Sequence, residues 1–327
     1  MILIVGVFIL SFFFSSSAHA SVLLPGDIST CGELASSGTY SLTSNITGVV
    51  GPCFVVTSNG VIITSTTTQH YIITAAGGNT SYAITATSTG AGYGTTTIQN
   101  ITFTSFGGGG INANGTTAGA GGNISVATST MGTTTSSGVG AASAGGNINI
   151  SNSNTGAVTA SGGIGGIGGA GGTITVTTNS IITGNIDSAG GNGDESVGGF
   201  ITITASSTVT GNITSTGGNG DFGGAGSIRI SANSNVIGNV LSLGGNAIND
   251  YGGPGMWIEI LNSTITGNVS SMGGASQTIY GGSGGNITLT GSSVSGAVSS
   301  VGFAGTNGGG AGGAQLQFLQ VLQLQGP

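Results

Sequence analysis

Charged residues are almost missing from this chain of 327 residues, in which Lys and Arg together number 1 and Asp and Glu together number 8. Binding to nucleic acid or to anionic lipid depends on several Lys and Arg side chains that attract phosphates. A single basic residue therefore excludes both partners. Disorder is disfavoured as well, because disordered chains combine high net charge with low hydrophobicity, and 37% of these residues are hydrophobic.

Proline, cysteine and histidine are also scarce, with 4, 2 and 2 residues against 70 glycines. Collagen would need glycine at every third position, and the sequence has no such period. In an exported chain Cys31 and Cys53 are expected to form a disulfide, with two free thiols as the alternative. A metal site built on histidine is not expected, because His70 is the only histidine after the N-terminal segment.

Residues 1–20 read MILIVGVFILSFFFSSSAHA and have the features of a secretory signal peptide. A short apolar run, residues 2–14, is followed by the tripeptide AHA, which is typical of a cleavage signal, although no Lys or Arg precedes the run. The run is shorter than the ~20 residues that a membrane-spanning helix needs. We therefore expect cleavage after Ala20, no membrane span in the mature chain, and a secreted or cell-surface location.

Short strand-like runs fill the rest of the chain. Residues 21–57 are the least repetitive part and are expected to form a cap over the first coil of the repetitive region. From residue 58, runs such as HYIITAA and TTIQNITFTSF are rich in Ile, Thr and Tyr, which favour strands, and Gly, Asn and Ser separate them. No segment has the i, i+3, i+4 apolar spacing of an amphipathic helix, so the sequence predicts an all-β protein.

Two phrases recur at intervals of roughly 27 residues, a period in the range of solenoid proteins. The first, G-x-I-x-I/V, places an apolar residue at Ile124, Ile148, Ile174, Ile201, Ile228, Ile258, Ile287 and Leu316. The second, GNI or GNV, places Ile186, Ile213, Val240 and Val269, with Val298 in the same position of the next unit. The intervals are too long and irregular for a left-handed hexapeptide helix. They predict a right-handed parallel β-helix over residues 58–327, with inward aliphatic side chains stacked in columns.

A family resemblance supports this fold. The run TTIQNITFTSF and the units GGxITIT…ITGNIxSxGGNG resemble secreted right-handed β-helix proteins of the pectate-lyase-like class, and also the Gly-rich repeats of bacterial surface β-helices, including haemagglutinin-type adhesins. The resemblance covers about residues 58–324. It implies the fold and leaves the function open, because the fold carries enzymes, adhesins and structural fibres. At the end of the chain Leu316 and Phe318 begin a coil that is not completed, so we expect a truncated solenoid, or an open edge that pairs with a partner.

Stacking in register would place equivalent residues of successive coils about 4.8 Å apart, which turns sequence spacing into contacts. Arg229 and Glu259 share one outward position and are expected to form a surface ion pair, with a catalytic pair as the alternative. A second outward position holds Phe200 and Trp257 with Ser227 between them, and an exposed Trp there could bind sugar unless a loop covers it. A corner position is shared by asparagines whose amides are expected to hydrogen-bond along the stack: Asn185, Asn212, Asn239 and Asn268.

An aromatic residue precedes the Gly-Gly pair in three successive loops, at Phe222, Tyr251 and Tyr280, and we assign Val197 to the same position one coil earlier. Carboxylates lie beside them, at Asp221 and Asp250, with Asp194 and Glu195 in the preceding loop. Rings that stack on pyranose faces and acids that accept hydrogen bonds from hydroxyls would form a glycan site. The alternatives are a ladder that only stabilises the loops and a Ca²⁺ site, the one metal that such acids suggest.

The sequence therefore predicts an exported structural or adhesive β-helix whose partners are glycans or neighbouring copies of the chain. One alternative is a polysaccharide lyase or glycoside hydrolase, but neither set of catalytic residues can be transferred. β-Helix lyases use a basic residue together with Ca²⁺ and this chain has no Lys, while the paired carboxylates of a glycosidase would have to come from Gly-rich loops. The other alternative is ice binding, suggested by the Thr-x-Thr segments 173–175 and 202–204, although Arg229, Trp257 and Glu259 interrupt that face.

Overall fold

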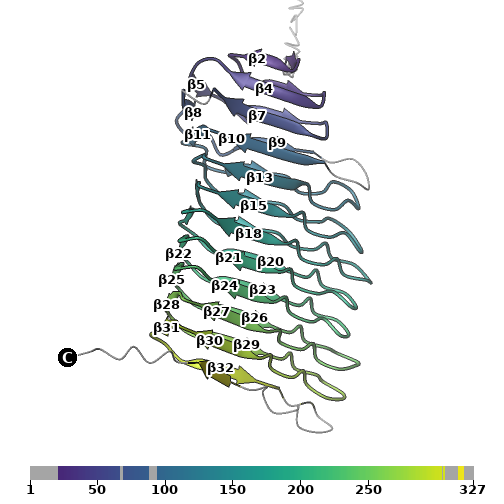
Figure 1. The fold of residues 1–327 in the computed structure, drawn as a ribbon. Coiled ribbons are helices and arrows are strands. Elements are labelled where there is room, and N and C mark those ends of the chain that lie inside the picture. The colour runs from purple at the N-terminus through teal and green to yellow at the C-terminus, as the bar shows by residue number, and fades with distance from the viewer. Residues whose placement is uncertain (1–20, 67–68, 88–93, 304, 306–315, 320–327) are drawn as a thin grey trace, which may run out of the picture.

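The computed structural model of this protein describes residues 21–66, 69–87, 94–303, 305 and 316–319. The described chain is all β, without a helix, and winds into a tall stack of coils (Figure 1). The predicted β-solenoid is therefore confirmed. No helix that is long and apolar enough to cross a membrane occurs in the described part of the chain. The predicted signal peptide and the residues after 319 lie outside it.

Three faces of parallel strands form the walls of the stack. The first face, sheet A, has 12 strands: β1 (Val22–Leu23), β3 (Gly32–Leu34), β6 (Phe54–Val56), β9 (Tyr82–Ala86), β12 (Gly109–Asn112), β14 (Thr134–Thr135), β17 (Val158–Thr159), β20 (Ile186–Ala189), β23 (Ile213–Thr216), β26 (Val240–Leu243), β29 (Val269–Met272) and β32 (Val298–Val301).

The second face, sheet B, also has 12 strands: β2 (Gly26–Ile28), β4 (Gly38–Leu42), β7 (Val61–Ser65), β10 (Thr95–Gln99), β13 (Asn123–Ala127), β15 (Ile148–Ser151), β18 (Ile174–Thr177), β21 (Ile201–Ile203), β24 (Ile228–Ile230), β27 (Ile258–Leu261), β30 (Ile287–Thr290) and β33 (Leu316–Leu319). The third face, sheet C, is divided into a short upper and a longer lower part: β5 (Ile46–Val49), β8 (Tyr71–Ala75), β11 (Ile101–Thr104), and β16 (Asn154–Thr155), β19 (Ile181–Ile182), β22 (Thr208–Thr210), β25 (Asn235–Ile237), β28 (Thr264–Thr266), β31 (Ser293–Val294).

Alternation along each strand builds the core. Along β21, Ile201 and Ile203 are fully buried while Thr202 between them points outward. Ile201 pairs with Ile174 in the coil before and with Ile228 in the coil after, so the expected aliphatic column is formed. The register follows the predicted repeat as far as Leu316, which pairs with Ile287. The GNI and GNV phrases form a second column on sheet A, from Ile186 to Val298.

Buried serines join sheet A to the loops that lead into sheet B, a feature that the sequence does not predict. Ser215 is fully buried on the inner side of sheet A. Its hydroxyl donates to the carbonyl of Gly199 at 2.8 Å and accepts the N–H of Gly226 at 2.9 Å. The same type of bond recurs in other coils at Ser136, Ser188, Ser242, Ser271 and Ser300. Because each such hydroxyl has a partner, burying it does not carry the cost of an unpaired polar group.

The predicted asparagine ladder is present, and its side chains hydrogen-bond along the stack as expected. The Oδ1 of Asn185 accepts the backbone N–H of Asn212, whose Oδ1 accepts that of Asn239, each at 2.9 Å. The series continues through Asn268 to the N–H of Ala297. The side chains therefore bond to backbone rather than to one another, because each corner leaves one N–H that no strand pairs.

Residues 21–57, the predicted cap, contain β1 to β6, and these strands pair in the same three sheets as the later coils. Within this segment Cys31 and Cys53 form the predicted disulfide, with their Cα atoms 4.6 Å apart. The bridge links the turn before β3 to the turn before β6, so it joins two adjacent layers of sheet A.

Replacing both cysteines with serine should lower the free energy of unfolding by about 3 kcal/mol, because the bridge restricts the unfolded chain over the 22 positions that it spans. Urea denaturation would measure the change. Reducing agent should destabilise the wild-type protein to a similar extent and leave the double variant unaffected. Equal stability of both proteins under oxidising conditions would contradict the prediction.

Candidate functional site

The candidate site lies on the Gly-rich loops that lead from each sheet A strand to the next sheet B strand (Figure 1). These loops stack backbone on backbone. The N–H of Gly245 bonds to the carbonyl of Gly223 at 2.6 Å, and a Cβ on Gly245 would collide with the carbonyl oxygen of Gly218. A second asparagine series runs through the loops, in which Asn192 accepts the N–H of Asn219 at 3.1 Å. Glycine here permits contact between backbones, and the loops are bonded from coil to coil.

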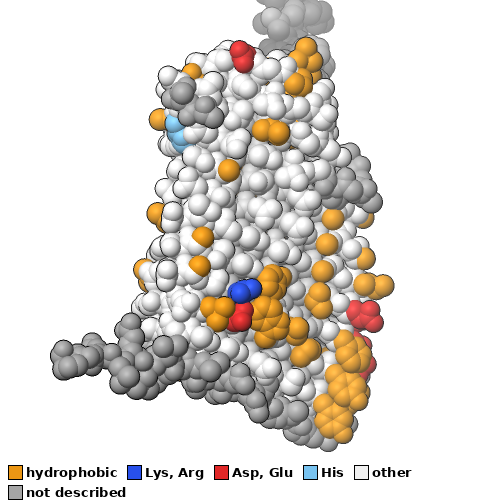
Figure 2. Space-filling view, in the orientation of Figure 1, with side chains coloured by type: hydrophobic (Ala, Val, Ile, Leu, Met, Phe, Trp, Pro, Cys, Tyr) orange, Lys and Arg blue, Asp and Glu red, His pale blue; other side chains and the backbone are white. Residues whose placement is uncertain are grey.

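Three aromatic rings stack along the outer edge of these loops, as the sequence predicts. The ring centroids of Phe222 and Tyr251 are 5.7 Å apart with an interplanar angle of 29°, and those of Tyr251 and Tyr280 are 5.7 Å apart at 19°. The three residues are 50%, 42% and 44% exposed, so no loop covers them. We call Phe222, Tyr251 and Tyr280 the aromatic stripe. Figure 2 shows hydrophobic side chains gathered along this edge with acidic side chains beside them.

The acidic residues next to the stripe also follow the stacking. Asp194 Oδ1 accepts the backbone N–H of Asp221 at 3.3 Å, which places the two acids in adjacent coils as predicted. Asp250 Oδ1 accepts the N–H of Tyr251 at 2.9 Å and so fixes the start of that loop turn. Among the residues that the structure describes, no three His, Cys, Asp or Glu side chains gather into a group that could hold a metal ion.

The assignment of Val197 to the aromatic position was wrong. The side chain of Val197 instead stands in one column with Gly224 and Pro254, because a Cβ on Gly224 would contact both. The counterpart of Phe222 is Glu195, whose N–H bonds to the carbonyl of Asp221. Both Glu195 and Phe222 have positive φ angles, of 58° and 62°. The sequence alignment took the residue before each Gly-Gly pair as equivalent. That alignment placed Val197 wrongly because the Gly-Gly pair occupies different positions in different loops.

A second aromatic platform lies on the outer side of sheet B. The rings of Phe200 and Trp257 come from coils separated by one layer, yet their centroids are 5.4 Å apart at an interplanar angle of 61°. The two rings cover Ser227, which holds the same position in the intervening coil and is only 7% exposed. Trp257 itself is 37% exposed, so no loop covers it. We call Phe200 and Trp257 the aromatic pair.

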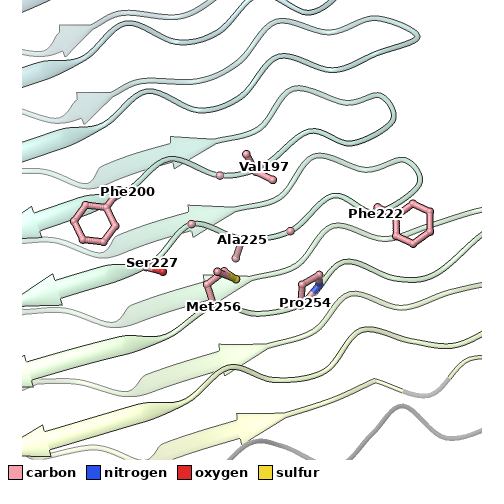
Figure 3. Close-up of a pocket in the computed structure, with 10 residues that line it drawn as sticks. Val197, Phe200, Phe222, Ala225, Ser227, Pro254 and Met256 are labelled. Atoms are coloured by element: carbon pink, nitrogen blue, oxygen red, sulfur yellow. The ribbon is translucent and has the colours of Figure 1, made fainter.

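A groove connects the aromatic pair to the aromatic stripe. Its volume is about 380 Å³, and Figure 3 shows Phe200 at one end, Phe222 at the other, and apolar side chains between them. The intervening side chains are Val197, Ala225, Pro254 and Met256. A second hollow of about 530 Å³ follows the stripe and shares Phe222 and Pro254 with the groove. The sequence did not indicate that Pro254 and Met256 belong to the site, because neither residue is part of a repeated phrase.

The predicted ion pair lies beside the aromatic pair. Arg229 Nε is 3.1 Å from Glu259 Oε2, and the side chains are 47% and 33% exposed. Glu259 and Trp257 both project outward at the start of β27, and Figure 2 shows the blue and red side chains against a hydrophobic patch. An exposed pair of this kind stabilises a fold by at most about 1 kcal/mol. Its main effect is to neutralise the only basic side chain of the protein.

Comparisons with known proteins do not extend these observations, since no family model, curated protein or solved structure matches this chain.

One carboxyl group outside the site has a perturbed environment. Asp187 lies on the outer side of β20, between Thr159 and Thr214 of the adjacent coils. Burial raises the pKa of the Asp187 carboxyl above its ordinary value of 3.8, because desolvation penalises the charged form. The folded protein therefore holds this proton more tightly than the unfolded chain does. Stability falls as the pH rises from below the ordinary pKa through the raised one, and stays lower above it.

Asp187→Asn should therefore raise the melting temperature at pH 7, because the amide has no charge to desolvate. The difference from wild type should shrink on acidification and vanish below pH 3.8, where the carboxyl is neutral in both states. Thermal denaturation followed by circular dichroism across this pH range would measure it. A variant that is less stable than wild type at pH 7 would contradict the prediction.

Proposed function

We propose that this protein is an exported structural or adhesive β-solenoid that binds glycans through the aromatic stripe. The observation that carries the proposal is the line of three exposed rings, Phe222, Tyr251 and Tyr280, with carboxylates at Asp221 and Asp250. Parallel rings suit the apolar faces of pyranose units, and carboxylates accept hydrogen bonds from sugar hydroxyls. The predicted signal peptide and the disulfide support a secreted or cell-surface location.

The energetics of the stripe favour a binding role over a purely stabilising one. Stacked rings contribute about 0.5–1.5 kcal/mol beyond the area that they bury. Phe222 holds a left-handed backbone conformation, which costs a residue with a Cβ roughly 1–2 kcal/mol. The two terms nearly cancel, so the Phe222 ring adds little net stability to its loop. Rings that remain about half exposed also stabilise the fold less than buried rings do, because about half of their area stays in contact with water.

Tyr251→Ala should weaken glycan binding at least tenfold, because it removes the central ring and interrupts the stripe. Phe222→Ala and Tyr280→Ala should weaken it less, since each leaves two adjacent rings intact. A glycan array would identify ligands, and calorimetry with the best ligand would measure the change. Ile167→Ala removes an even more exposed apolar side chain, 60% exposed, from an earlier loop and should bind like wild type.

Absence of binding to every glycan tested would contradict the proposal and leave self-association or a structural role. Release of sugar fragments from polygalacturonate or similar polymers would instead show that the protein is a polysaccharide-degrading enzyme.

The outer face of sheet B supports ice binding as a second candidate function. Its central outward column contains small polar residues in register over five successive coils: Thr97, Ser125, Asn149, Thr175 and Thr202. Regularly spaced hydroxyls on a flat sheet could order water at the strand spacing of about 4.8 Å. Below Thr202, Arg229 and Glu259 occupy this column and interrupt the series of small polar residues.

If ice binding is the function, the wild-type protein should show thermal hysteresis and Thr175→Tyr should abolish most of it, because a ring would interrupt the hydroxyl column. A freezing-point measurement on both proteins tests this. The stripe variant Tyr251→Ala is the control and should keep full activity. A wild-type protein without hysteresis excludes this second candidate and leaves glycan binding untouched.

A further inference from the structure

We propose that the ligand of the aromatic stripe is a neutral oligosaccharide chain that continues through the groove to the aromatic pair. This inference rests on the proposed glycan function and specifies its ligand class and the extent of its site. It makes the groove, Met256 and Trp257 parts of one elongated surface, and it gives the ion pair a role in selectivity.

Continuity of the surface supports an extended ligand. The groove and the hollow along the stripe share Phe222 and Pro254, so the two hollows adjoin each other. Their volumes, about 380 and 530 Å³, each fall in the range of sites that hold small ligands of roughly 300–1,000 Å³. Because the stripe runs along the stack and the groove runs from the loop edge toward sheet B, a bound chain would cross both. A single sugar would fill only one part of this surface.

The lining of the groove suits the apolar face of a sugar chain. Val197, Ala225, Pro254 and Met256 present hydrocarbon, and the glycines between them bring the backbone close to the surface. The groove ends at Phe200, whose ring contacts Trp257. Trp257 is the only tryptophan of the protein. Aromatic residues at both ends of an apolar groove are expected to anchor a ligand, since large rings dominate binding energies at such surfaces.

Charge determines which sugars fit. Two carboxylates lie in the stripe loops, at Asp221 and Asp250, two more lie in the preceding loop, at Asp194 and Glu195, and the net charge of the protein is −7. The only basic side chain, Arg229, is occupied by Glu259. A uronic-acid or sulfated polymer would therefore bring its negative charges toward carboxylates without meeting a free cation, and like charges at an interface are unfavourable. Neutral sugars avoid this repulsion and offer hydroxyl donors to the same acids.

The decisive experiment titrates wild-type protein with neutral β-1,4-linked glucose, xylose and mannose chains, from disaccharides to hexasaccharides, and with oligogalacturonates of the same lengths. We expect affinity to rise at least tenfold from disaccharide to hexasaccharide for one neutral series, and weak or absent binding of the galacturonates. Trp257→Ala should remove the gain with length, whereas Trp257→Phe should keep most of it. Tyr251→Ala should weaken binding at every length.

A gain-of-function variant tests the charge argument separately. Glu259→Gln leaves Arg229 without its partner beside the aromatic pair, so the variant should bind hexagalacturonate at least several-fold more tightly than wild type does. Glu33→Gln, which removes a surface acid far from the site, should not. Melting temperatures would show that each variant is folded.

The possible failures are distinguishable. Binding that does not depend on chain length, or that is unaffected by Trp257→Ala, would overturn the extended site and leave the proposed function standing. Wild-type binding of galacturonates as tight as that of neutral chains would overturn the charge argument. If no glycan of either class binds, both proposals fail, and capture of a protein partner at Trp257 would assign the surface to protein recognition.

Discussion

Hydrogen bonding between coils in a fixed register is the constraint on which this structure depends. A single coil orders roughly 27 residues at about 1–2 kcal/mol of backbone entropy each, and its few buried aliphatic residues return only about 1.5–3 kcal/mol each. The coil is stable only because its neighbours satisfy its backbone groups and cover its apolar side chains. Each added coil must therefore repeat the register of the one before it, as the unbroken pairing from Ile124 to Leu316 shows.

The same register explains which features the sequence could predict. Contacts that join equivalent positions of adjacent coils follow from spacing alone, so the pairing of Arg229 with Glu259 and the stacking of Phe222, Tyr251 and Tyr280 could be foreseen. The disulfide followed from the number of cysteines. Contacts between a strand of sheet A and the loops that follow depend instead on the path of each loop. Nothing in the sequence indicates that Ser215 turns inward to bond Gly199 and Gly226, because a serine in a strand reads as an outward residue.

Loop geometry was predictable only where the residues compared hold equivalent positions within their loops. Asp194 and Asp221 are equivalent residues 27 positions apart, and the N–H of Asp221 bonds to Asp194 Oδ1 in the adjacent coil. The position of Val197 was misjudged because the Gly-Gly pair shifts within the loop, and the groove that Val197 lines was missed with it. A sequence repeat therefore predicts only the contacts between residues that recur in every coil. The residues that form the groove, such as Pro254 and Met256, occur where the pattern is broken.

Stacking also answers an objection to a binding site built on loops. Isolated Gly-rich loops position side chains poorly, since glycine gives the backbone many conformations. Here each loop is bonded to the next, through Gly245 to Gly223 and through the asparagine series that begins at Asn192. The absence of Cβ atoms is what permits this close packing of backbones, so the residue that makes one loop flexible makes a stack of loops ordered. The aromatic rings at the loop edge are therefore regularly spaced, because their loops follow the spacing of the strands. Such a regular row of rings suits a ligand that is itself a chain of repeating units.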